Sequence, residues 1–290
     1  MTFKGSIVAL VTPFRNGEVD FRALDALTDW HLAAGTNGIV PIGTTGESPT
    51  VTDEERTKIL KAVIGRCKGK IPVIAGTGTN DTRKSIAYTK EAKALGADAA
   101  LVVTPYYNKP TQEGLYRHIE AIAKAADLPI VLYNIPYRSV VSVEPPTVAR
   151  CAKLKNVVAI KETSGSVEYV TQIRQLCDLT IISGEDAQTY PMMMLGATGV
   201  ISVLANGMPA EMAALCRSAL AGDWAAAKAQ HEKLYKIAKA MFIETNPIPV
   251  KTALRMMGKI DGELRLPLCP MGEGNEAKLR DVLREYRLVS

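Results

Sequence analysis

The chain has 290 residues, of which 47% are hydrophobic and 22% charged, and its formal net charge is +5. This composition excludes the disordered and collagen-like classes, and the length allows one large barrel or two smaller domains with a sizeable core. Basic and acidic residues alternate along the expected helices, so the charge indicates a solvated surface and gives no case for a nucleic-acid partner.

Short apolar runs alternate with amphipathic segments along most of the chain. The runs predicted to form strands are residues 6–12, 38–43, 72–77, 99–105, 129–136, 157–163, 179–184 and 199–205. Helical periodicity is expected in residues 20–35, 52–64, 82–95, 112–126, 145–153 and 167–176, and from about Asp186. Near-continuous apolar strands between helices predict parallel pairing, and eight of them favour a closed (β/α)8 barrel over an open sheet.

From about Trp224 the pattern changes to helices alone, with candidates at residues 225–240, 250–257 and 275–286. The sequence therefore predicts a catalytic barrel in residues 1–223 and a helical C-terminal domain in residues 224–290. Because these helices have apolar faces and no strands of their own, we expect them to pack on the barrel or on another subunit.

Five cysteines are scattered along the chain without CxxC spacing, and their number is odd. This pattern favours free thiols in a reducing compartment over a disulfide framework or a zinc site. The N-terminus lacks a secretory pattern, and no apolar run reaches the roughly 18 residues of a membrane span. We therefore expect a cytoplasmic protein without a membrane partner.

One lysine ends an apolar, β-branched run. Residues 156–160 have the composition of a strand buried on both faces, and Lys161 follows directly. Desolvation lowers a lysine pKa, and a neutral amine attacks carbonyl carbon, as in Schiff-base enzymes. The alternative is that Lys161 reaches water past the strand end or pairs with Glu162.

Polar side chains gather where the other predicted strands end, which is the face of a barrel that carries active sites. These positions are Thr44, Thr45, Ser48, Tyr106, Tyr107, Tyr133 and Arg138, and acidic residues follow Gly184 at the end of the seventh strand. Simpler interpretations remain open: residues 43–46 could be an ordinary turn and the two adjacent tyrosines packing aromatics. Arg138 could equally form a surface ion pair.

Other kinds of catalytic site find little support. His31, His118 and His231 lie far apart in helical stretches and form no HxxxH or HExxH pair, so we expect no metal ion. A GxSxG nucleophile elbow is also missing. If carbonyl carbon is activated here, a lysine must do it.

Seven motifs together give a specific resemblance that covers essentially the whole chain. They occupy residues 43–48, 106–108, 133–138, 160–163, 199–203, 246–251 and 264–267. The set resembles the family of the 4-hydroxy-tetrahydrodipicolinate synthases, also called dihydrodipicolinate synthases. This family belongs to the superfamily of pyruvate-dependent class I aldolases typified by N-acetylneuraminate lyase.

The resemblance implies a lyase of the hydro-lyase class in diaminopimelate and lysine biosynthesis, which condenses pyruvate with L-aspartate 4-semialdehyde and needs no cofactor. Lys161 would carry pyruvate as a Schiff base that tautomerises to an enamine. Thr44, Tyr133 and Tyr107 would form a proton relay, with Tyr107 supplied by the neighbouring subunit of a homotetramer built as a dimer of dimers.

The same resemblance implies the residues that bind substrate. Thr45 would hold the pyruvate carboxylate, and Arg138 would bind the carboxylate of the semialdehyde, a task suited to a planar guanidinium that is always charged. The backbone at Gly184 and Ile201 would line the pocket.

The chain departs from the family at a regulatory site. Relatives that lysine inhibits bind it between subunits with an acidic residue and a histidine, at positions that here are Lys84 and Arg56. A further variable histidine position is Asp53, whereas Ser48, Asn80 and Tyr106 are kept. Because Lys84 and Arg56 would repel the ammonium groups of lysine, we expect weak or absent feedback inhibition.

Two alternative functions follow from other interpretations of the same residues. A related aldolase could act on sialic acid or a 2-keto-3-deoxy sugar acid, but Arg138 favours a small charged aldehyde as the second substrate. A catalytically silent barrel used as a binding protein would be expected to lack Lys161, Tyr133 or Thr44, and all three are present.

Overall fold

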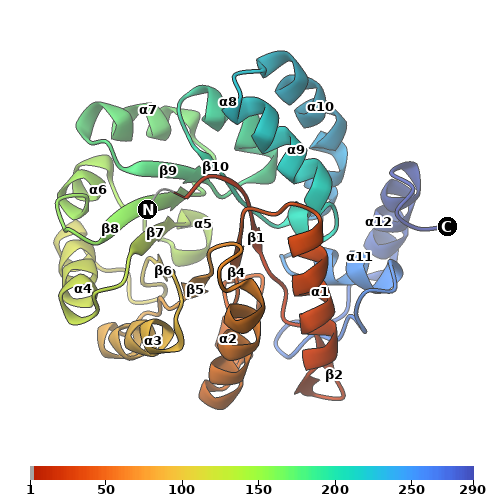
Figure 1. Ribbon diagram of the computed structural model, residues 1–290, viewed down its shortest axis with the longest axis horizontal. Coiled ribbons are helices and arrows are strands. Elements are labelled where there is room, and N and C mark those ends of the chain that lie inside the picture. The colour runs from red at the N-terminus through yellow and green to blue at the C-terminus, as the bar shows by residue number, and fades with distance from the viewer. Residues whose placement is uncertain (1–2) are drawn as a thin grey trace.

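Eight parallel strands surround one axis in the computed structural model, which describes residues 3–290 (Figure 1). They are β1 (Gly5–Ala9), β4 (Gly38–Val40), β5 (Ile74–Gly76), β6 (Ala99–Val103), β7 (Ile130–Asn134), β8 (Val157–Glu162), β9 (Thr180–Ser183) and β10 (Gly199–Ser202). A parallel bridge between Ile39 and Val73 joins β4 to β5, where Ile39 N donates to Pro72 O at 3.0 Å. The (β/α)8 barrel predicted from the sequence is confirmed.

The alternation of side chains along each strand decides which residues can form a site. Successive residues of a strand point to opposite faces, here the barrel axis and the surrounding helices. In β8, Ala159 lies in the inner hydrophobic cluster, whereas Ile160 belongs to the outer cluster under the helices. Lys161 follows Ala159 by two residues, so its side chain points into the barrel at the carboxyl end of the strand.

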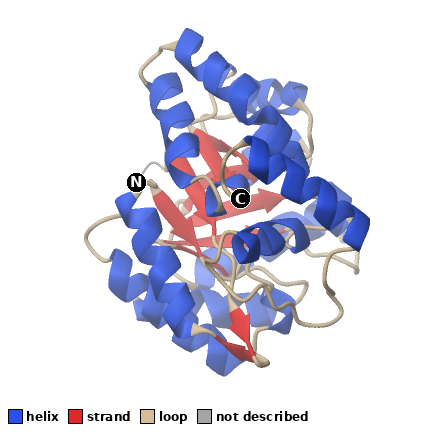
Figure 2. Cartoon of the chain, turned by 90° about the vertical axis from the view of Figure 1, so that its right-hand side faces the viewer, coloured by secondary structure: helices blue, strands red, loops and turns tan. Residues whose placement is uncertain are grey.

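Helices cover the outside of the barrel, as Figure 2 shows. They are α1 (Phe21–Ala33), α2 (Asp53–Cys67), α3 (Thr82–Leu95), α4 (Gln112–Ala125), α6 (Pro145–Cys151), α7 (Val167–Leu176), α8 (Thr189–Met194) and α9 (Pro209–Leu220). The short helix α5 (Pro136–Ser139) directly follows β7, and the 3-10 turns are η1 (Ser48–Thr50), η2 (Asp186–Gln188) and η3 (Leu204–Asn206). The capping box expected before α2 is present: Glu55 N donates to Thr52 Oγ1 at 3.2 Å and Thr52 N donates to Glu55 Oε2 at 2.9 Å.

Several elements differ from the sequence expectation, among them the short helix α5, which was not predicted. The Gly17 turn joins a small hairpin, β2 (Phe14–Arg15) with β3 (Glu18–Val19), that the sequence did not predict. Helix α9 was also missed, because Met208, the residue that precedes it, provides no side-chain cap of the kind that marks a helix N-terminus. The helix expected from Asp186 begins as the turn η2, and α8 starts only at Thr189.

The C-terminal helices pack against the barrel of their own chain. They are α10 (Trp224–Ala240), α11 (Ile248–Met256) and α12 (Glu273–Glu285), and α10 lies beside α9 (Figure 1). Leu234 and Ile237 of α10 and Leu279 and Leu283 of α12 belong to the same buried cluster as the outer face of the strands. Within residues 3–290, no helix is both long and apolar enough to cross a membrane.

Candidate active site

Lys161 lies in the barrel beside a phenol from the neighbouring strand. Parallel pairing of β7 and β8 places Tyr133 opposite Lys161, and the Lys161 Nζ is 4.1 Å from the centroid of the Tyr133 ring. Only 5% of the lysine is exposed. Burial lowers the pKa of Lys161 to about 8, although the negative charges of Glu185 and Asp186 oppose this shift. A substantial fraction of the amine is therefore neutral near physiological pH.

A second buried lysine shows why burial alone does not make a nucleophile. Lys251 is fully buried, and burial lowers its pKa as well, but the Glu47 carboxylate opposes this shift; its Nζ donates to Glu47 Oε1 at 2.5 Å and to Thr12 O at 2.9 Å, so the amine is already engaged. Lys161 Nζ has no hydrogen bond or ion pair with any residue of the described chain, 3–290. Of the two lysines, Lys161 is thus the one free to react.

The alternative placements of Lys161 are wrong. Its low exposure excludes a side chain that reaches bulk water. Glu162 points to the outer side of β8, where its carboxylate accepts hydrogen bonds from Asn134 Nδ2 at 2.9 Å and Ser164 N at 2.5 Å. No ion pair between Lys161 and Glu162 competes with a reaction at the amine.

Tyr133 is suited to hold and transfer a proton. It is 4% exposed, and burial raises the pKa of Tyr133 to about 12, while the Thr44 hydroxyl and the charge of Arg138 oppose the rise. The phenol is therefore protonated at neutral pH and can donate a proton to a developing negative charge. The structure brings Thr44, Tyr133 and Lys161 together, as expected from the strand ends.

Asn246, which precedes α11, connects the two residues expected to bind carboxylates. Its Nδ2 donates to Thr45 Oγ1 at 3.0 Å, and its carbonyl oxygen accepts a hydrogen bond from Arg138 Nη2 at 2.9 Å. Sequence reasoning assigned Asn246 no role, although it begins one of the family motifs. Its position depends on the C-terminal segment folding back over the barrel mouth, which strand ends do not reveal.

Two cavities meet at Arg138. The larger, of about 440 Å³, is also lined by Tyr137, Glu185, Lys239 and Asn246. Burial raises the pKa of Glu185 to about 7, and the negative charge of Asp186 adds to the rise. The smaller cavity, of about 220 Å³, is lined by four of the predicted site residues, Thr44, Ser48, Tyr106 and Arg138, among others. Both volumes suit small molecules, and the guanidinium provides a fixed positive charge for an anionic group.

Gly184 leaves the space through which the Lys161 side chain passes. A Cβ atom at Gly184 would lie 2.8 Å from Lys161 Cε and would clash with Thr163 Oγ1. The Gly184 amide donates to Glu162 O at 2.7 Å, which holds the end of β9 against β8. Ile201, the other expected backbone position, is buried in the barrel interior and pairs with Ile7.

Tyr107 is the one expected catalytic residue that lies apart from the others. It is 91% exposed and has a backbone φ of 73°, so it neither packs as a core aromatic nor contacts Tyr133 within this chain. Its neighbour Tyr106 is 37% exposed and lines the smaller cavity.

The variable regulatory positions gather around one aromatic ring. Arg56 Cζ lies 3.9 Å and Lys84 Nζ 5.3 Å from the centroid of Tyr88, whose hydroxyl donates to Asp53 Oδ1 at 2.5 Å. Arg56 is buried, and its Nη2 donates to Gly76 O at 2.5 Å. Two cations, Arg56 and Lys84, therefore lie beside the same aromatic ring.

The remaining candidates contribute no further site. The carbonyl of Asn80 accepts a hydrogen bond from Asn108 Nδ2 at 2.9 Å. All five cysteines are unpaired. In the part of the chain that the structure describes, no group of three or more His, Cys, Asp or Glu side chains is arranged to hold a metal ion.

Comparison with known proteins agrees with this geometry over the full length. The model of the dihydrodipicolinate synthetase family matches residues 2–286. The 4-hydroxy-tetrahydrodipicolinate synthase of Geotalea daltonii is 53% identical and covers 99% of this chain and 100% of its own. The crystal structure of dihydrodipicolinate synthase from Aquifex aeolicus superimposes with a TM-score of 0.97 at 49% identity, covering 99% of each chain.

A third relative is described as the first monomeric dihydrodipicolinate synthase variant. It is 46% identical to this chain, covers 99% of it and 98% of its own length, and has a TM-score of 0.97. The likeness to these proteins thus extends from the barrel through the C-terminal helices. The chain belongs to the dihydrodipicolinate synthetase family.

Proposed function

We propose that this protein is a 4-hydroxy-tetrahydrodipicolinate synthase, a lyase that condenses pyruvate with L-aspartate 4-semialdehyde in diaminopimelate and lysine biosynthesis. The observation that carries the proposal is the buried, unpaired amine of Lys161, 4.1 Å from the Tyr133 ring centroid, in a chain of this family. Arg138 at the junction of two cavities supports an anionic aldehyde as the second substrate.

The reaction begins with covalent attachment of pyruvate. The neutral Lys161 amine attacks C2 of pyruvate, and the carbinolamine loses water to give an imine. Loss of a proton from C3 gives the enamine, whose C3 attacks the aldehyde carbon of the second substrate. The new alkoxide takes up a proton, and the amino group of the semialdehyde part then attacks C2, closes the ring and releases Lys161.

Dehydration of the carbinolamine, enamine formation and protonation of the alkoxide all require proton transfer close to Lys161. We assign this work to Tyr133, which is close to Lys161, and to Thr44, whose hydroxyl interacts with the phenol. Thr45 is assigned to the pyruvate carboxylate and Arg138 to the semialdehyde carboxylate, with the backbone at Gly184 and Ile201 lining the pocket.

Substrate choice is tested directly with purified protein. Turnover of pyruvate plus aspartate semialdehyde, coupled to the downstream reductase and followed as NADPH loss, is expected. Cleavage of N-acetylneuraminate or a 2-keto-3-deoxy sugar acid, followed as pyruvate release, is not expected. If sugar-acid cleavage were the faster reaction, the protein would be an aldolase of the same superfamily.

Imine formation should depend on pH through the lysine. Because only the neutral amine attacks, and the pKa of Lys161 is lowered to about 8, the rate should rise about tenfold per pH unit below pH 8 and level off above it. Glu185, with a pKa of about 7, loses its proton in the same range, and its charge then raises the pKa of Lys161, which broadens the curve. Rapid-quench borohydride trapping at several pH values measures this; a rate that keeps rising towards pH 10 would contradict a lowered pKa.

Feedback by lysine should be weak or absent. Arg56, although it pairs with Glu91 at 3.6 Å, and Lys84 place two positive charges beside Tyr88, where they disfavour the ammonium groups of a lysine ligand. Turnover measured at increasing lysine concentration should stay nearly constant. The double change Arg56→His with Lys84→Glu removes the repulsion and should create sensitivity. Strong inhibition of the unchanged protein by submillimolar lysine would overturn this expectation.

We also propose a homotetramer, built as a dimer of dimers, in which Tyr107 completes the proton relay of the neighbouring subunit. The exposure of Tyr107 is what this role requires. Sedimentation velocity tests it, and a fully active monomer would remove Tyr107 from the relay. Within each subunit we propose a catalytic barrel of residues 1–223 and a C-terminal helical domain of residues 224–290.

A further inference from the structure

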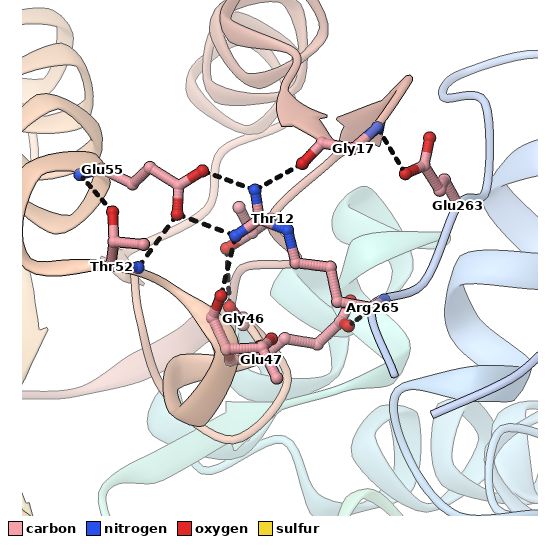
Figure 3. A network of polar contacts seen from close by, with 9 residues as sticks. Thr12, Gly17, Gly46, Glu47, Thr52, Glu55, Glu263 and Arg265 are labelled. Atoms are coloured by element: carbon pink, nitrogen blue, oxygen red, sulfur yellow. Dashed lines mark hydrogen bonds and ion pairs between the residues drawn. The ribbon is translucent and has the colours of Figure 1, made fainter. Parts of the chain in front are cut away.

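Three charged residues from three of the family motifs have no role in the reaction scheme and meet in one polar network, of which Figure 3 shows the part around Glu47 and Arg265. Glu47 comes from the motif at residues 43–48, Lys251 from residues 246–251 and Arg265 from residues 264–267. Lys251 Nζ donates to Glu47 Oε1 at 2.5 Å, and Arg265 N donates to Glu47 Oε2 at 3.1 Å. The side chains of Lys251 and Glu47 are 0% and 1% exposed.

The network reaches outward through the guanidinium of Arg265. This group donates to both carboxylate oxygens of Glu55, at 2.5 and 2.7 Å, and to the carbonyls of Thr50 and Gly17, both at 2.7 Å. Figure 3 shows Arg265 between the Gly17 turn and the start of α2. Arg265, from the C-terminal segment, thus holds the backbone at Gly17 and at Thr50, which lie before and after Glu47 in the chain.

The segment held by this network is the turn that carries Thr44 and Thr45. Ile42 and Glu47, which flank the turn, have φ angles of 55° and 53°, a region that non-glycine residues rarely adopt and that is an outlier for a β-branched residue such as Ile42. Such strain persists only where the surroundings over-determine the backbone. Thr12 Oγ1 also donates to Gly46 O at 2.7 Å, in addition to the contacts of Glu47.

Stability is a poor reason to keep such an ion pair. Removing two charges from water is costly, and replacing a buried pair by neutral groups of similar volume is often neutral or stabilising. The pair does, however, fix the distance between the turn and the C-terminal helices, because each charge has only one geometry in which it is satisfied.

We propose that Glu47, Lys251 and Arg265 are positioning residues, which hold the turn at residues 42–47 so that Thr44 faces Tyr133 and Thr45 faces the pyruvate carboxylate. This inference rests on the proposed roles of Thr44 and Thr45. It explains why a second buried lysine close to the active site is not a nucleophile: Lys251 orients the residues that receive the substrate.

The test removes both charges together, in the variant Glu47→Gln with Lys251→Met, so that no unpaired charge is buried. The pyruvate concentration that half-saturates borohydride trapping, and the KM for pyruvate, should each rise about tenfold or more, as expected for displaced substrate-binding groups. The KM for aspartate semialdehyde should change by less than about twofold, because Arg138 lies on α5 and bonds to the main-chain carbonyl of Asn246, whereas Thr45 of the turn bonds only to the Asn246 side chain.

A matched control is available on the surface. Lys236 and Glu285 form an ion pair at the same N–O distance, 2.5 Å, but both side chains are more than half exposed. Glu285→Gln with Lys236→Met should leave trapping and both KM values unchanged. The surface double variant therefore measures how much trapping and KM change when the protein loses two opposite charges away from the turn.

One result would overturn the inference. If the buried double variant trapped pyruvate like the unchanged protein and differed only in melting temperature, the pair would serve stability alone. If that variant does not fold, Glu47→Asp, which keeps the charge and withdraws it by one methylene, takes its place: raised pyruvate values are expected, and unchanged trapping would overturn the inference. Failure of the unchanged protein to trap pyruvate would instead refute the proposed function itself, so the two failures are distinguishable.

Discussion

Replacing Lys161 by Ala should abolish borohydride trapping of pyruvate and lower turnover by a factor on the order of 10⁴ or more, as for loss of a covalent nucleophile. The amine that forms the imine is then missing, and no neighbour can replace it. Lys251, the other buried lysine discussed above, is bound to Glu47 and Thr12.

The experiment needs a control for folding and for lysine content. Lys236→Ala removes an exposed lysine of α10 and should retain full trapping and turnover. Circular dichroism of Lys161→Ala should match that of the unchanged protein, because loss of a buried amine that bonds to no described residue removes no native hydrogen bond. Retained labelling of a folded Lys161→Ala variant would rule out this lysine as the carrier of pyruvate.

Changing Tyr133 to Phe should lower turnover by about 10² to 10³, the usual contribution of a well-placed acid or base. The phenol is buried beside Lys161, and with a pKa raised to about 12 it is protonated at neutral pH and able to donate. The phenyl ring keeps the packing around the lysine. Steady-state kinetics should therefore show a low kcat in a protein that stays folded.

A second buried phenol serves as the matched control. Tyr169 is 8% exposed and donates its hydroxyl hydrogen bond to Val143 O, in the layer outside the barrel. Tyr169→Phe should reduce the free energy of unfolding by about 1 kcal/mol, the typical net value of a buried hydrogen bond, and leave kcat unchanged. Near-normal turnover in Tyr133→Phe would exclude the phenol as the main proton donor.

The barrel could be predicted from the sequence because its strands and helices have different hydrophobic periods. The bounds expected for α3 and α7 agree with the structure, and the capping box marked the start of α2. Predicted strands were too long at their carboxyl ends, since residues such as Leu10 and Val11 are buried although they lie beyond β1. Apolar runs report burial, and burial continues past the last strand hydrogen bond.

The site residues at the strand ends could be predicted from the sequence, whereas the contacts made by the C-terminal segment could not. Lys161 and Tyr133 end adjacent strands, and parallel pairing places them side by side. The contacts of Asn246 with Thr45 and of Lys251 with Glu47 join residues about 200 positions apart. In the sequence Lys251 is an ordinary helical lysine, and only the fold shows that it is buried against a carboxylate.

The central claim is that Lys161 alone carries pyruvate, and the most direct measurement is to locate the covalent adduct. The unchanged protein is treated with pyruvate and borohydride, digested with a protease, and its peptides are sequenced by mass spectrometry. The account predicts a single reduced adduct on Lys161 and an unmodified Lys251. An adduct on Lys251 or on a surface lysine, with Lys161 unmodified, would contradict it.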